Sequence, residues 1–482
     1  MLKRMFRKLA GKVRFFRRFC SEAYYTLNGW RFADLKNYVD QSTNVNEDAQ
    51  FAFSVMRQEF ATLNLRSAND APERARLALV TCLPPDASGI ARYSLEHALA
   101  SHESLDVFSP VRDPSYFMLN AARLRRCRAN NSNLFPINTL LAMDELHAYE
   151  HVIFVVGNSN HNIDTYRFME SFVKLNGPER AICYLHDPCC HNIVQMAKRL
   201  SNSQYYALLQ KLYDDRFAQS EGDNGANESW HVHQLGVERG LLGARAILDT
   251  GINRFIVNSG AAARILEEDF RESDRSMVSI NSLYHPVFPL VVTPPVSMER
   301  DVTKLTIGTF GLPGRSKRTD TVIEAAQELR TRGQDVRLII AGYQAEQFSH
   351  HYFGDKCPPW IELSEPHTEQ ELQLLMAECD IAVQLRERNL GESSGIVPTL
   401  LAMRKAVVVS PVGSFEEYDQ AAIMFDADSI ALANLLETRP SVAPDQVEAY
   451  VARHDLSHFS RDFVEAVSNR GEKWPVTFRR LA

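Results

Sequence analysis

The stretch LRERNLGESSGIVPTLLAMRKAVVVSPVGSFEE, residues 385–417, decides the fold of this chain. Its polar start ends in the small-residue run GESSG at 391–395, which passes into a helical stretch at 397–404 and then a strand-like run at 406–410. A helix that begins after small residues presents free backbone N–H groups to an anion. The pattern predicts a strand, turn, helix and strand unit that holds a phosphate-bearing ligand, with the carboxylate of Glu392 beside it.

The residues before this unit repeat the alternation of strand and helix. We expect strands at 304–311, 336–342, 360–363 and 380–385, with helices at 321–332 and 369–378. Short apolar strands that alternate with helices are typical of a doubly wound parallel sheet. The first of these strands ends in Gly311, and the following loop carries Arg315, Lys317 and Arg318, whose charges suit a diphosphate.

The amino-terminal half has the same rhythm. We expect strands at 75–81, 151–156, 180–185 and 254–259, with helices beginning near Ile90 and at 261–270. The loop after the first strand contains Gly89 but lacks the G-x-G-x-x-G fingerprint, so no nicotinamide cofactor is expected. Polar residues follow the later strands at their carboxyl ends, where α/β sheets bind ligands; they are Asn158, His161, His186, Asp187 and Ser259.

Length and composition fit two large domains with extensions. The chain has 482 residues, of which 45% are hydrophobic and 23% charged, as in ordinary soluble globular proteins. The net charge of −7 argues against general nucleic-acid binding. Eight cysteines without framework spacing indicate reduced thiols in a cytoplasmic protein. We divide the chain into five segments. They are an amino-terminal extension and connector (1–72), a first Rossmann-like domain (73–285), a proline-rich linker (286–302), a second Rossmann-like domain (303–444) and a helical tail (445–482).

The first 25 residues differ from the average composition. Basic residues recur through this segment, and apolar residues return at helical spacing. Such a basic amphipathic helix suits an anionic membrane surface, which would make the protein peripheral on the inner face of the cytoplasmic membrane. Packing on the protein's own body and a targeting peptide are the alternatives that the residues leave open.

One cluster of ligand-type side chains invites a metal assignment. His186, Asp187, Cys189, Cys190 and His191 follow one another closely. Adjacent cysteines do not match the spacing of structural zinc sites, and no second C-x-x-C pair completes a tetrahedron. We therefore expect no metal site.

The motifs of the second half carry a family resemblance. Leu385-Arg386 before the turn, the Ser-Gly pair within it and PVGSFEE at 411–417 together resemble the donor-binding half of retaining glycosyltransferases of family four, including bacterial polysaccharide and lipopolysaccharide mannosyltransferases. The resemblance implies the GT-B fold, with two Rossmann-like doubly wound domains facing across a cleft and the tail crossing back to the first domain. It also implies metal-independent, retaining transfer of a hexose, with mannose the first choice, from a nucleotide diphosphate sugar to a glycan or glycolipid acceptor, without a cofactor.

The resemblance assigns the donor side residue by residue. Lys317 matches a family lysine that holds the pyrophosphate, whereas the usual arginine after the glycine is Leu312, so Arg315 or Arg318 would replace it. Glu392 matches the acid that contacts the donor sugar. The second acid, which contacts the ribose, is Leu400 here, with Glu416 or Glu417 as substitutes. The expected donor-binding residues are Gly89, Gly311, Arg315, Lys317, Arg386, Gly391, Ser394, Gly395, Ile396, Val397 and Glu417.

The acceptor side is assigned to the first domain. The resemblance places Asn158 and His161 in the cleft, and it gives His186 and Asp187 a catalytic role on the acceptor hydroxyl. Ser259 is an acceptor-side candidate, for which an N-cap of the next helix is an equal alternative. Two other functions remain open. One is a sugar-nucleotide epimerase, and the other is a non-catalytic nucleotide-sugar-binding protein or complex subunit, which Leu312 and Leu400 motivate.

Overall fold

The computed structural model describes residues 77–126, 132–141, 149–217, 236–292 and 304–468, apart from positions 87, 102, 104, 238, 355 and 419. These residues form two compact units, each built on one parallel sheet. The first unit holds the described residues up to Ile256 together with 269–280 and 467–468, and the second holds 257–268 and 281–466. The predicted amino-terminal helix and connector and residues 293–302 of the linker lie outside the described residues.

The first unit contains a seven-stranded sheet in the order β3-β2-β1-β4-β5-β6-β7. Its strands are β1 (Leu77–Val80), β2 (Leu105–Ser109), β3 (Leu134–Pro136), β4 (His151–Val156), β5 (Ala181–Leu185), β6 (Arg254–Val257) and β7 (Ser279–Ser282). β1, β4 and β5 are buried along their whole length, which suits a parallel sheet covered on both faces. The four predicted strands are confirmed, whereas β2, β3 and β7 were not predicted.

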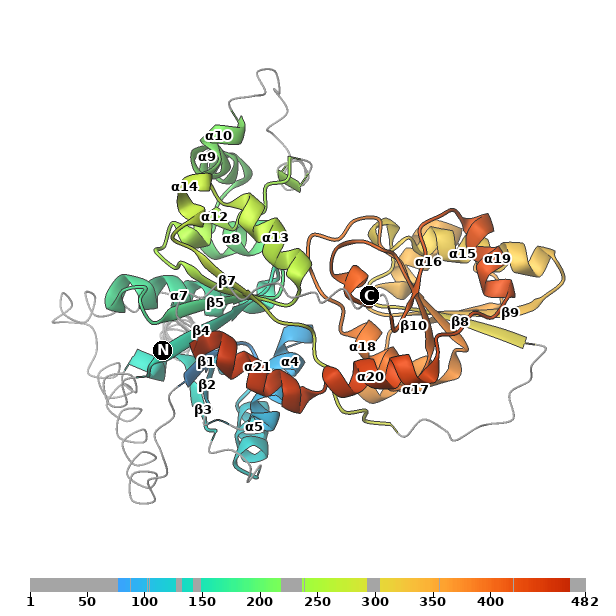
Figure 1. Cartoon of the computed structure of the whole chain (residues 1–482), viewed down its shortest axis with the longest axis horizontal. Coiled ribbons are helices and arrows are strands. Elements are labelled where there is room, and N and C mark those ends of the chain that lie inside the picture. The colour runs from blue at the N-terminus through green and yellow to red at the C-terminus, as the bar shows by residue number, and fades with distance from the viewer. Residues whose placement is uncertain are drawn as a thin grey trace, which may run out of the picture. The chain divides into compact units, whose positions relative to one another are not determined.

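Helices cover both faces of this sheet (Figure 1). They are α4 (Gly89–Ala100), α5 (Pro114–Arg126), α7 (Ile163–Asn176), α8 (His191–Lys198), α9 (Asn202–Leu212), α10 (Asp214–Phe217), α12 (Arg245–Leu248) and α14 (Glu272–Arg275), with the 3₁₀ turns η2 (Ile137–Thr139) and η3 (Asn160–Asn162). The connections β1-α4-β2 and β2-α5-β3 place α4 and α5 side by side, while α7 packs against β4 and α8. Each crossover thus returns the chain to the same edge of the sheet, so the loops after the strands gather there.

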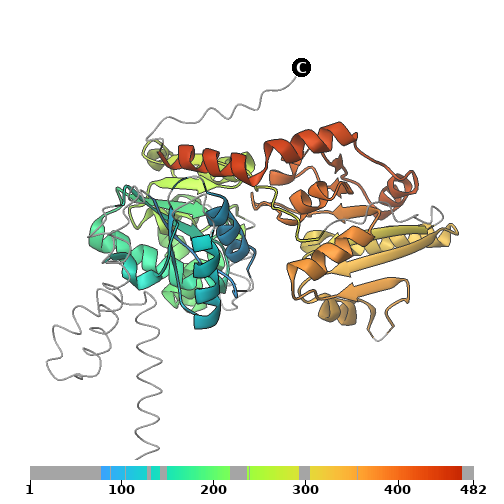
Figure 2. The same cartoon turned by 90° about the horizontal axis from the view of Figure 1, so that it is seen from below.

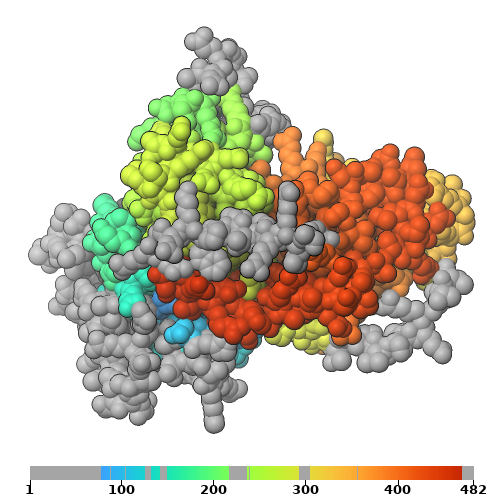
Figure 3. Space-filling model, viewed as in Figure 1, coloured from blue at the N-terminus to red at the C-terminus, as the bar shows by residue number. Residues whose placement is uncertain are grey.

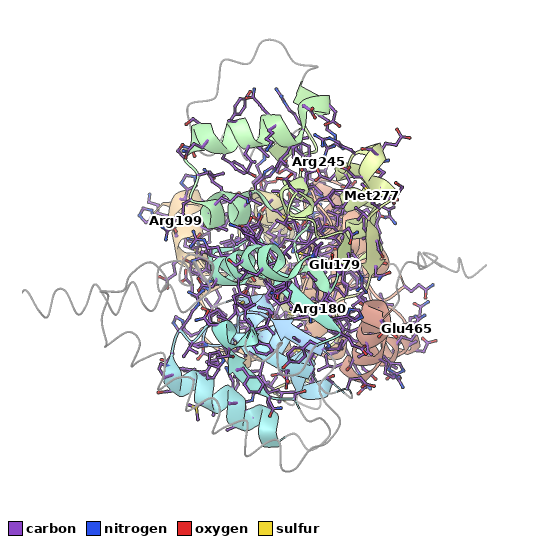
Figure 4. The ribbon with its side chains drawn as sticks, turned by 90° about the vertical axis from the view of Figure 1, so that its left-hand side faces the viewer. Glu179, Arg180, Arg199, Arg245, Met277 and Glu465 are labelled. Carbon is purple, nitrogen blue, oxygen red and sulfur yellow. The ribbon has the colours of Figure 1, made fainter. Side chains whose placement is uncertain are left out.

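A buried polar network fixes the outer helices of the first unit. The Tyr213 hydroxyl donates to Asp269 Oδ2 at 2.6 Å, and the Leu242 N–H donates to Asp269 Oδ1 at 2.9 Å. Arg245, labelled in Figure 4, lies with its guanidinium 4.3 Å from the Tyr213 ring centre and pairs with Asp215 at 2.6 Å. Burial raises the pKa of Asp269 to about 6. Hydrogen bonds to these buried groups offset much of their desolvation cost.

The second unit contains a six-stranded sheet in the order β10-β9-β8-β11-β12-β13. Its strands, coloured yellow to orange in Figure 2, are β8 (Lys304–Phe310), β9 (Asp335–Ala341), β10 (Ile361–Ser364), β11 (Ile381–Gln384), β12 (Ala406–Val409) and β13 (Ile423–Met424). Its helices are α13 (Gly260–Asp269), α15 (Thr319–Thr331), α16 (Ala345–Phe353), α17 (Glu369–Glu378), α18 (Ile396–Ala402), α19 (Ser429–Glu437), α20 (Pro444–Arg453) and α21 (Leu456–Ser468), with the 3₁₀ turns η4 (Arg315–Lys317) and η5 (Gly413–Tyr418). All the strands and helices predicted for this half are present.

Two hydrophobic clusters sandwich the second sheet. Alternate residues of β9 enter opposite clusters, with Leu338 and Ile340 on one face and Ile339 and Ala341 on the other, as the period of a strand requires. Helices α15, α16 and α19 cover the first face, and α17, α18 and α20 cover the second (Figure 1). Helix α20 begins with a proline at its first turn and lies at the surface shown in Figure 3, where only Val447 and Tyr450 of its residues are buried.

Helices α20 and α21 occupy the described residues of the tail predicted at 445–482, whose crossing back to the first domain stays a prediction. No described helix has the length and apolar character needed to cross a lipid bilayer.

Candidate functional site

Each sheet contains one point at which the direction of winding reverses. In the first unit the chain passes from β1 to β2 and β3, then returns to β4 on the other side of β1. In the second it passes from β8 to β9 and β10, then returns to β11 on the other side of β8. Open α/β sheets bind ligands beyond the carboxyl ends of the strands at such switch points. The loops after β1 and β4, and those after β8 and β11, are therefore the candidate sites.

Glycines shape the loop after β8. Gly311 has a φ of 101°, a conformation that favours glycine, and its N–H donates to the Ala341 carbonyl at 2.8 Å. A Cβ on Gly342 would lie 2.2 Å from the Gly311 carbonyl oxygen, so this close approach of two backbones requires a second glycine. The sequence analysis proposed Gly311 as a site residue but not Gly342, which it read only as the last residue of the predicted strand at 336–342.

The cations of this loop lie in different surroundings. Arg315 has an 86% exposed side chain and pairs with Glu387 at 3.3 Å, while the Glu387 N–H donates to the Ser316 carbonyl at 3.0 Å. These contacts join the loop after β8 to the loop after β11, as a shared site requires. Arg318 instead donates to the Ala427 carbonyl and pairs with Asp426 at 3.4 Å. Of the two predicted replacements for the missing arginine, Arg315 is the more accessible.

The GESSG turn after β11 is held by side chains from both ends. Gly391 has a φ of 96°, and its N–H donates to Asn389 Oδ1 at 2.7 Å. The Glu392 carbonyl accepts from Asn389 Nδ2 at 3.0 Å and from Ser414 Oγ at 2.6 Å. Glu392 Oε2 accepts the Leu390 N–H at 2.8 Å, which fixes the half-buried carboxylate in one direction. Sequence reasoning missed Asn389 and Ser414, although an asparagine two residues before a glycine is a turn signal.

Arg386 is a buried cation at the end of the same strand. Arg386 is only 7% exposed. Its guanidinium lies 4.7 Å from the Phe415 ring centre, and Nη1 donates to the Leu385 carbonyl at 2.8 Å. Nε has no hydrogen-bond partner among the described residues. Burial lowers the pKa of Arg386 to about 10, and the charge of Glu392 opposes this shift. Arg386 thus contributes a fixed positive charge beneath the turn.

Helix α18 turns its apolar side chains into the core. Val397 and Leu400 are fully buried in the cluster that contains Phe415, while Ser394 is also buried and Gly395 is exposed. No atom of Val397 is therefore exposed to a ligand, contrary to its predicted donor-binding role, and Ile396 is half-buried. The position at which the resembled family has its second acid is a core position here, which the sequence alone did not show.

Two further candidates meet at helix α13. Glu417 Oε1 accepts the Gly260 N–H at 2.8 Å, and burial raises the pKa of Glu417 to about 7. Ser259 Oγ accepts the Ala262 N–H at 2.9 Å and donates to the Gly391 carbonyl at 3.0 Å. Ser259 is thus a helix cap, the alternative weighed for it from the sequence, and it also supports the GESSG turn.

In the first unit, Asn158 and Asp187 are in direct contact. Asp187 Oδ2 accepts the Asn158 N–H at 2.9 Å, and Asn158 Oδ1 accepts the Ile193 N–H at the start of α8 at 3.0 Å. His186 is buried between two aromatic rings, with its centroid 4.4 Å from that of Tyr93 and 4.8 Å from that of Tyr184. The carboxylate is therefore held rigidly, and the imidazole beside it is packed rather than exposed.

His161 belongs to a cluster of charged side chains that the sequence did not predict. Arg112 pairs with Asp86 and with Asp164, at 3.1 Å in each case, and His161 Nδ1 lies 3.4 Å from Asp86 Oδ1. These four residues are called the Arg112 cluster below. Burial raises the pKa of Asp86 although Arg112 and His161 oppose the shift. Gly89 begins α4 nearby, where a Cβ would meet no atom within 4 Å, so space alone does not require a glycine.

The suspected metal ligands have structural roles where their contacts are given. His191 Nδ1 lies 2.6 Å from the Tyr205 hydroxyl and Nε2 lies 2.7 Å from the Leu241 carbonyl. Within the described part of the chain, no three His, Cys, Asp or Glu side chains gather closely enough to bind a metal ion. Metal independence of the protein stays a prediction.

Comparison with known proteins supports the fold through structure alone. No protein-family model and no curated protein matches the chain. HepE of Anabaena in complex with UDP and glucose is 13% identical, with 82% of this chain and all of HepE aligned at a TM-score of 0.52. HepE in complex with UDP-glucose is 15% identical, with 81% of this chain and 99% of HepE aligned at a TM-score of 0.50. The chain has the GT-B fold. A glycosyltransferase of Rickettsia africae is 11% identical over 81% of this chain and 97% of its own, at a lower TM-score of 0.48.

Proposed function

We propose that this chain is a glycosyltransferase that moves a hexose, with mannose the first candidate, from a nucleotide diphosphate sugar to a glycan or lipid-linked acceptor with retention of configuration. The observation that carries the proposal is the β8/β11 switch point, where the loop after β8 carries Arg315 and Lys317 and the GESSG turn after β11 fixes the carboxylate of Glu392. Its GT-B fold supports a nucleotide sugar as donor, because the similar HepE was solved with UDP-glucose.

The chemistry follows from what the donor loses. When the bond between the sugar and the diphosphate breaks, the leaving group gains negative charge, and the new bond forms to an acceptor hydroxyl. Cations and backbone N–H groups held in place before the reaction stabilise that charge without reorganising. Lys317, Arg315 and the buried Arg386 supply the positive charge, and the fixed carboxylate of Glu392 accepts hydrogen bonds from sugar hydroxyls. On the acceptor side, Asp187 is the candidate to bind the attacking hydroxyl.

Diphosphate release tests this function directly. The wild-type chain is incubated with GDP-, UDP- and dTDP-sugars, with and without a membrane glycolipid extract, beside Glu392→Ala and the matched control Glu324→Ala on the exposed side of α15. We expect one donor to release diphosphate when acceptor is present, Glu392→Ala to reduce the rate by roughly a hundredfold or more, and the control to retain it. Release that is equal in all three proteins would contradict the assignment of Glu392.

A second candidate follows from Leu400. Because the second acid of the resembled family is replaced by a buried core residue, a non-catalytic nucleotide-sugar-binding protein or complex subunit is the alternative. It predicts tight donor binding in calorimetry without release under any acceptor. Conversion of the donor sugar without acceptor would instead indicate an epimerase.

A further inference from the structure

We propose that the Arg112 cluster is a subsite for the hydroxyl groups of a neutral acceptor sugar and that it disfavours acidic or phosphorylated sugars. The inference deepens the proposed function and rests on it, because it names the acceptor chemistry of that reaction. The cluster lies entirely in the first unit. Asp86 comes from the loop after β1, Arg112 from the loop after β2, and His161 and Asp164 from the segment after β4. Three loops thus converge at the switch point where a ligand of this sheet is expected.

The cluster holds hydrogen-bonding groups in a fixed arrangement. Arg112 Nε contacts Asp86 Oδ1, and Nη2 contacts both Asp164 Oδ2 and the His161 carbonyl, the latter at 3.3 Å. These contacts leave Arg112 Nη1 and Asp86 Oδ2 without a partner among the described residues. The Arg112 side chain is still 34% exposed, whereas that of Asp86 is 9% exposed. A sugar hydroxyl can accept from Nη1 and donate to Oδ2, and little side-chain entropy is lost because the groups are already ordered.

The charges select against an anion. One guanidinium faces two carboxylates at 3.1 Å, so the cluster has a net charge of −1 when His161 is neutral. Asp113, the next residue after Arg112, adds a further carboxylate at the start of α5, where it accepts the Ser115 N–H at 2.8 Å. A carboxylate or phosphate on the acceptor would meet these charges at short range. A neutral polyol satisfies donors and acceptors alike without that cost.

The loops do not depend on the cluster alone for their positions. Asn120 Nδ2 donates to the Pro84 carbonyl at 2.7 Å, which ties the loop after β1 to α5. The Thr81 N–H donates to the Phe108 carbonyl at 3.0 Å, which joins the ends of β1 and β2. Substitutions in the cluster should therefore change ligand binding more than folding.

Direct binding tests the proposal without turnover. Saturation-transfer difference NMR is recorded on the full chain with methyl glucoside, mannoside and galactoside and with the corresponding uronides, each up to about 50 mM, because monosaccharide affinities are commonly millimolar. We expect at least one neutral glycoside to bind better than its uronide. Arg112→Gln and Asp86→Asn should weaken that binding about tenfold, which is the effect of losing one or two hydrogen bonds. Asp86→Asn should also reduce the difference in affinity between a glycoside and its uronide, because one carboxylate of the cluster is lost. The matched control is Arg123→Gln, which removes an arginine of the same unit that pairs with Glu96.

The outcomes separate the inference from the proposed function. Equal binding of glycosides and uronides, no binding of any neutral glycoside, or unchanged binding in both variants would overturn the subsite. If diphosphate is released and the variants bind glycosides as the wild type does, the subsite is overturned and the proposed transferase function is retained. Glycoside binding lost in the variants without any diphosphate release would retain the subsite and reject the transferase. Circular dichroism melts identify a variant that fails to fold. If either Arg112→Gln or Asp86→Asn does so, glycoside binding by the other variant tests the subsite.

Discussion

The two switch points are built on the same kind of sheet but carry opposite charges. At the first, Asp86 and Asp164 share Arg112, and Asp187 lies in the neighbouring loop. At the second, Arg315 and Lys317 lie in the loop after β8, and Arg386 is buried at the end of β11. The strand ends at the two switch points are called the first and the second edge below. An edge with net negative charge suits hydroxyl groups, and an edge with net positive charge suits phosphates. The difference shows that the fold provides two equivalent positions and that the loops give each its chemistry.

The two edges also differ in what holds them. The first is fixed by ion pairs between side chains, so a ligand meets side-chain atoms. The second depends on Gly311, Gly342 and Gly391, whose conformations or close contacts exclude larger residues. Glycines bring backbone N–H groups within reach of a ligand, as phosphate recognition commonly requires. The proposed division into acceptor and donor edges therefore rests on backbone geometry as well as on charge.

Leu400→Glu tests whether the second edge can hold a second carboxylate, as the first does. Leu400 is fully buried among apolar side chains, so an ionised glutamate there lacks partners. We expect a loss of about 4 kcal/mol in the free energy of unfolding, with no gain in nucleotide affinity. Urea unfolding measures the loss, and Leu400→Met, which conserves volume, is the control. A stable variant that binds donor more tightly would show that position 400 faces the ligand.

Glu417→Gln compares the half-buried acids of the two edges. Asp86 has a guanidinium beside it, whereas Glu417 caps α13, and burial raises its pKa from 4.5 to about 7. Between these pH values the folded chain binds more protons than the unfolded one, so stability falls as pH rises from about 4.5 to 7 and is level above. We expect a loss of about 3 kcal/mol over this window in the wild type and little of it in Glu417→Gln, whose amide still accepts the Gly260 N–H.

Calorimetric melts at pH 5 and pH 8 measure this difference. Glu416→Gln, at the exposed neighbouring position, should follow the wild type. Identical pH dependence in all three proteins would mean that Glu417 is ionised throughout and that its hydrogen bonds outweigh its burial.

The sequence predicted the fold where strands are continuous apolar runs. β4 and α17 have their predicted bounds, because VIFVV in β4 and the capping box at Thr368 are strong local signals. β2 was missed because Asp106 interrupts its apolar run. That carboxylate is buried and accepts from the Tyr149 hydroxyl at 2.7 Å, a partner 43 residues away. Only the tertiary structure supplies such a partner, so local patterns could not identify the strand.

The site was predicted less completely than the fold, for the same reason. Glu392, Lys317 and Asp187 were proposed as site residues because they follow recognisable strands, and their roles stay predictions. Arg112 follows the missed strand β2, and Asp164 lies in the first turn of α7, so nothing in the sequence placed either beside Asp86. The core position of Leu400 was equally hidden, because α18 is only seven residues long and its buried face depends on Phe415.

Lys317→Ala has the smallest expected effect, and it measures the charge difference between the two switch points most directly. Lys317→Ala should weaken UDP or GDP binding about tenfold and reduce its dependence on salt, because one cation near the diphosphate is lost. The control is Arg318→Gln at the next position, where the guanidinium already binds Asp426 and the Ala427 carbonyl. It should change nucleotide affinity less than about twofold, because the Arg318 guanidinium is already engaged by these two partners. Titration calorimetry at two salt concentrations measures both, and methyl glycoside binding in the same proteins should be independent of salt. If the two variants weaken nucleotide binding equally, general positive charge would explain the second edge, and the specific placement of Lys317 would not.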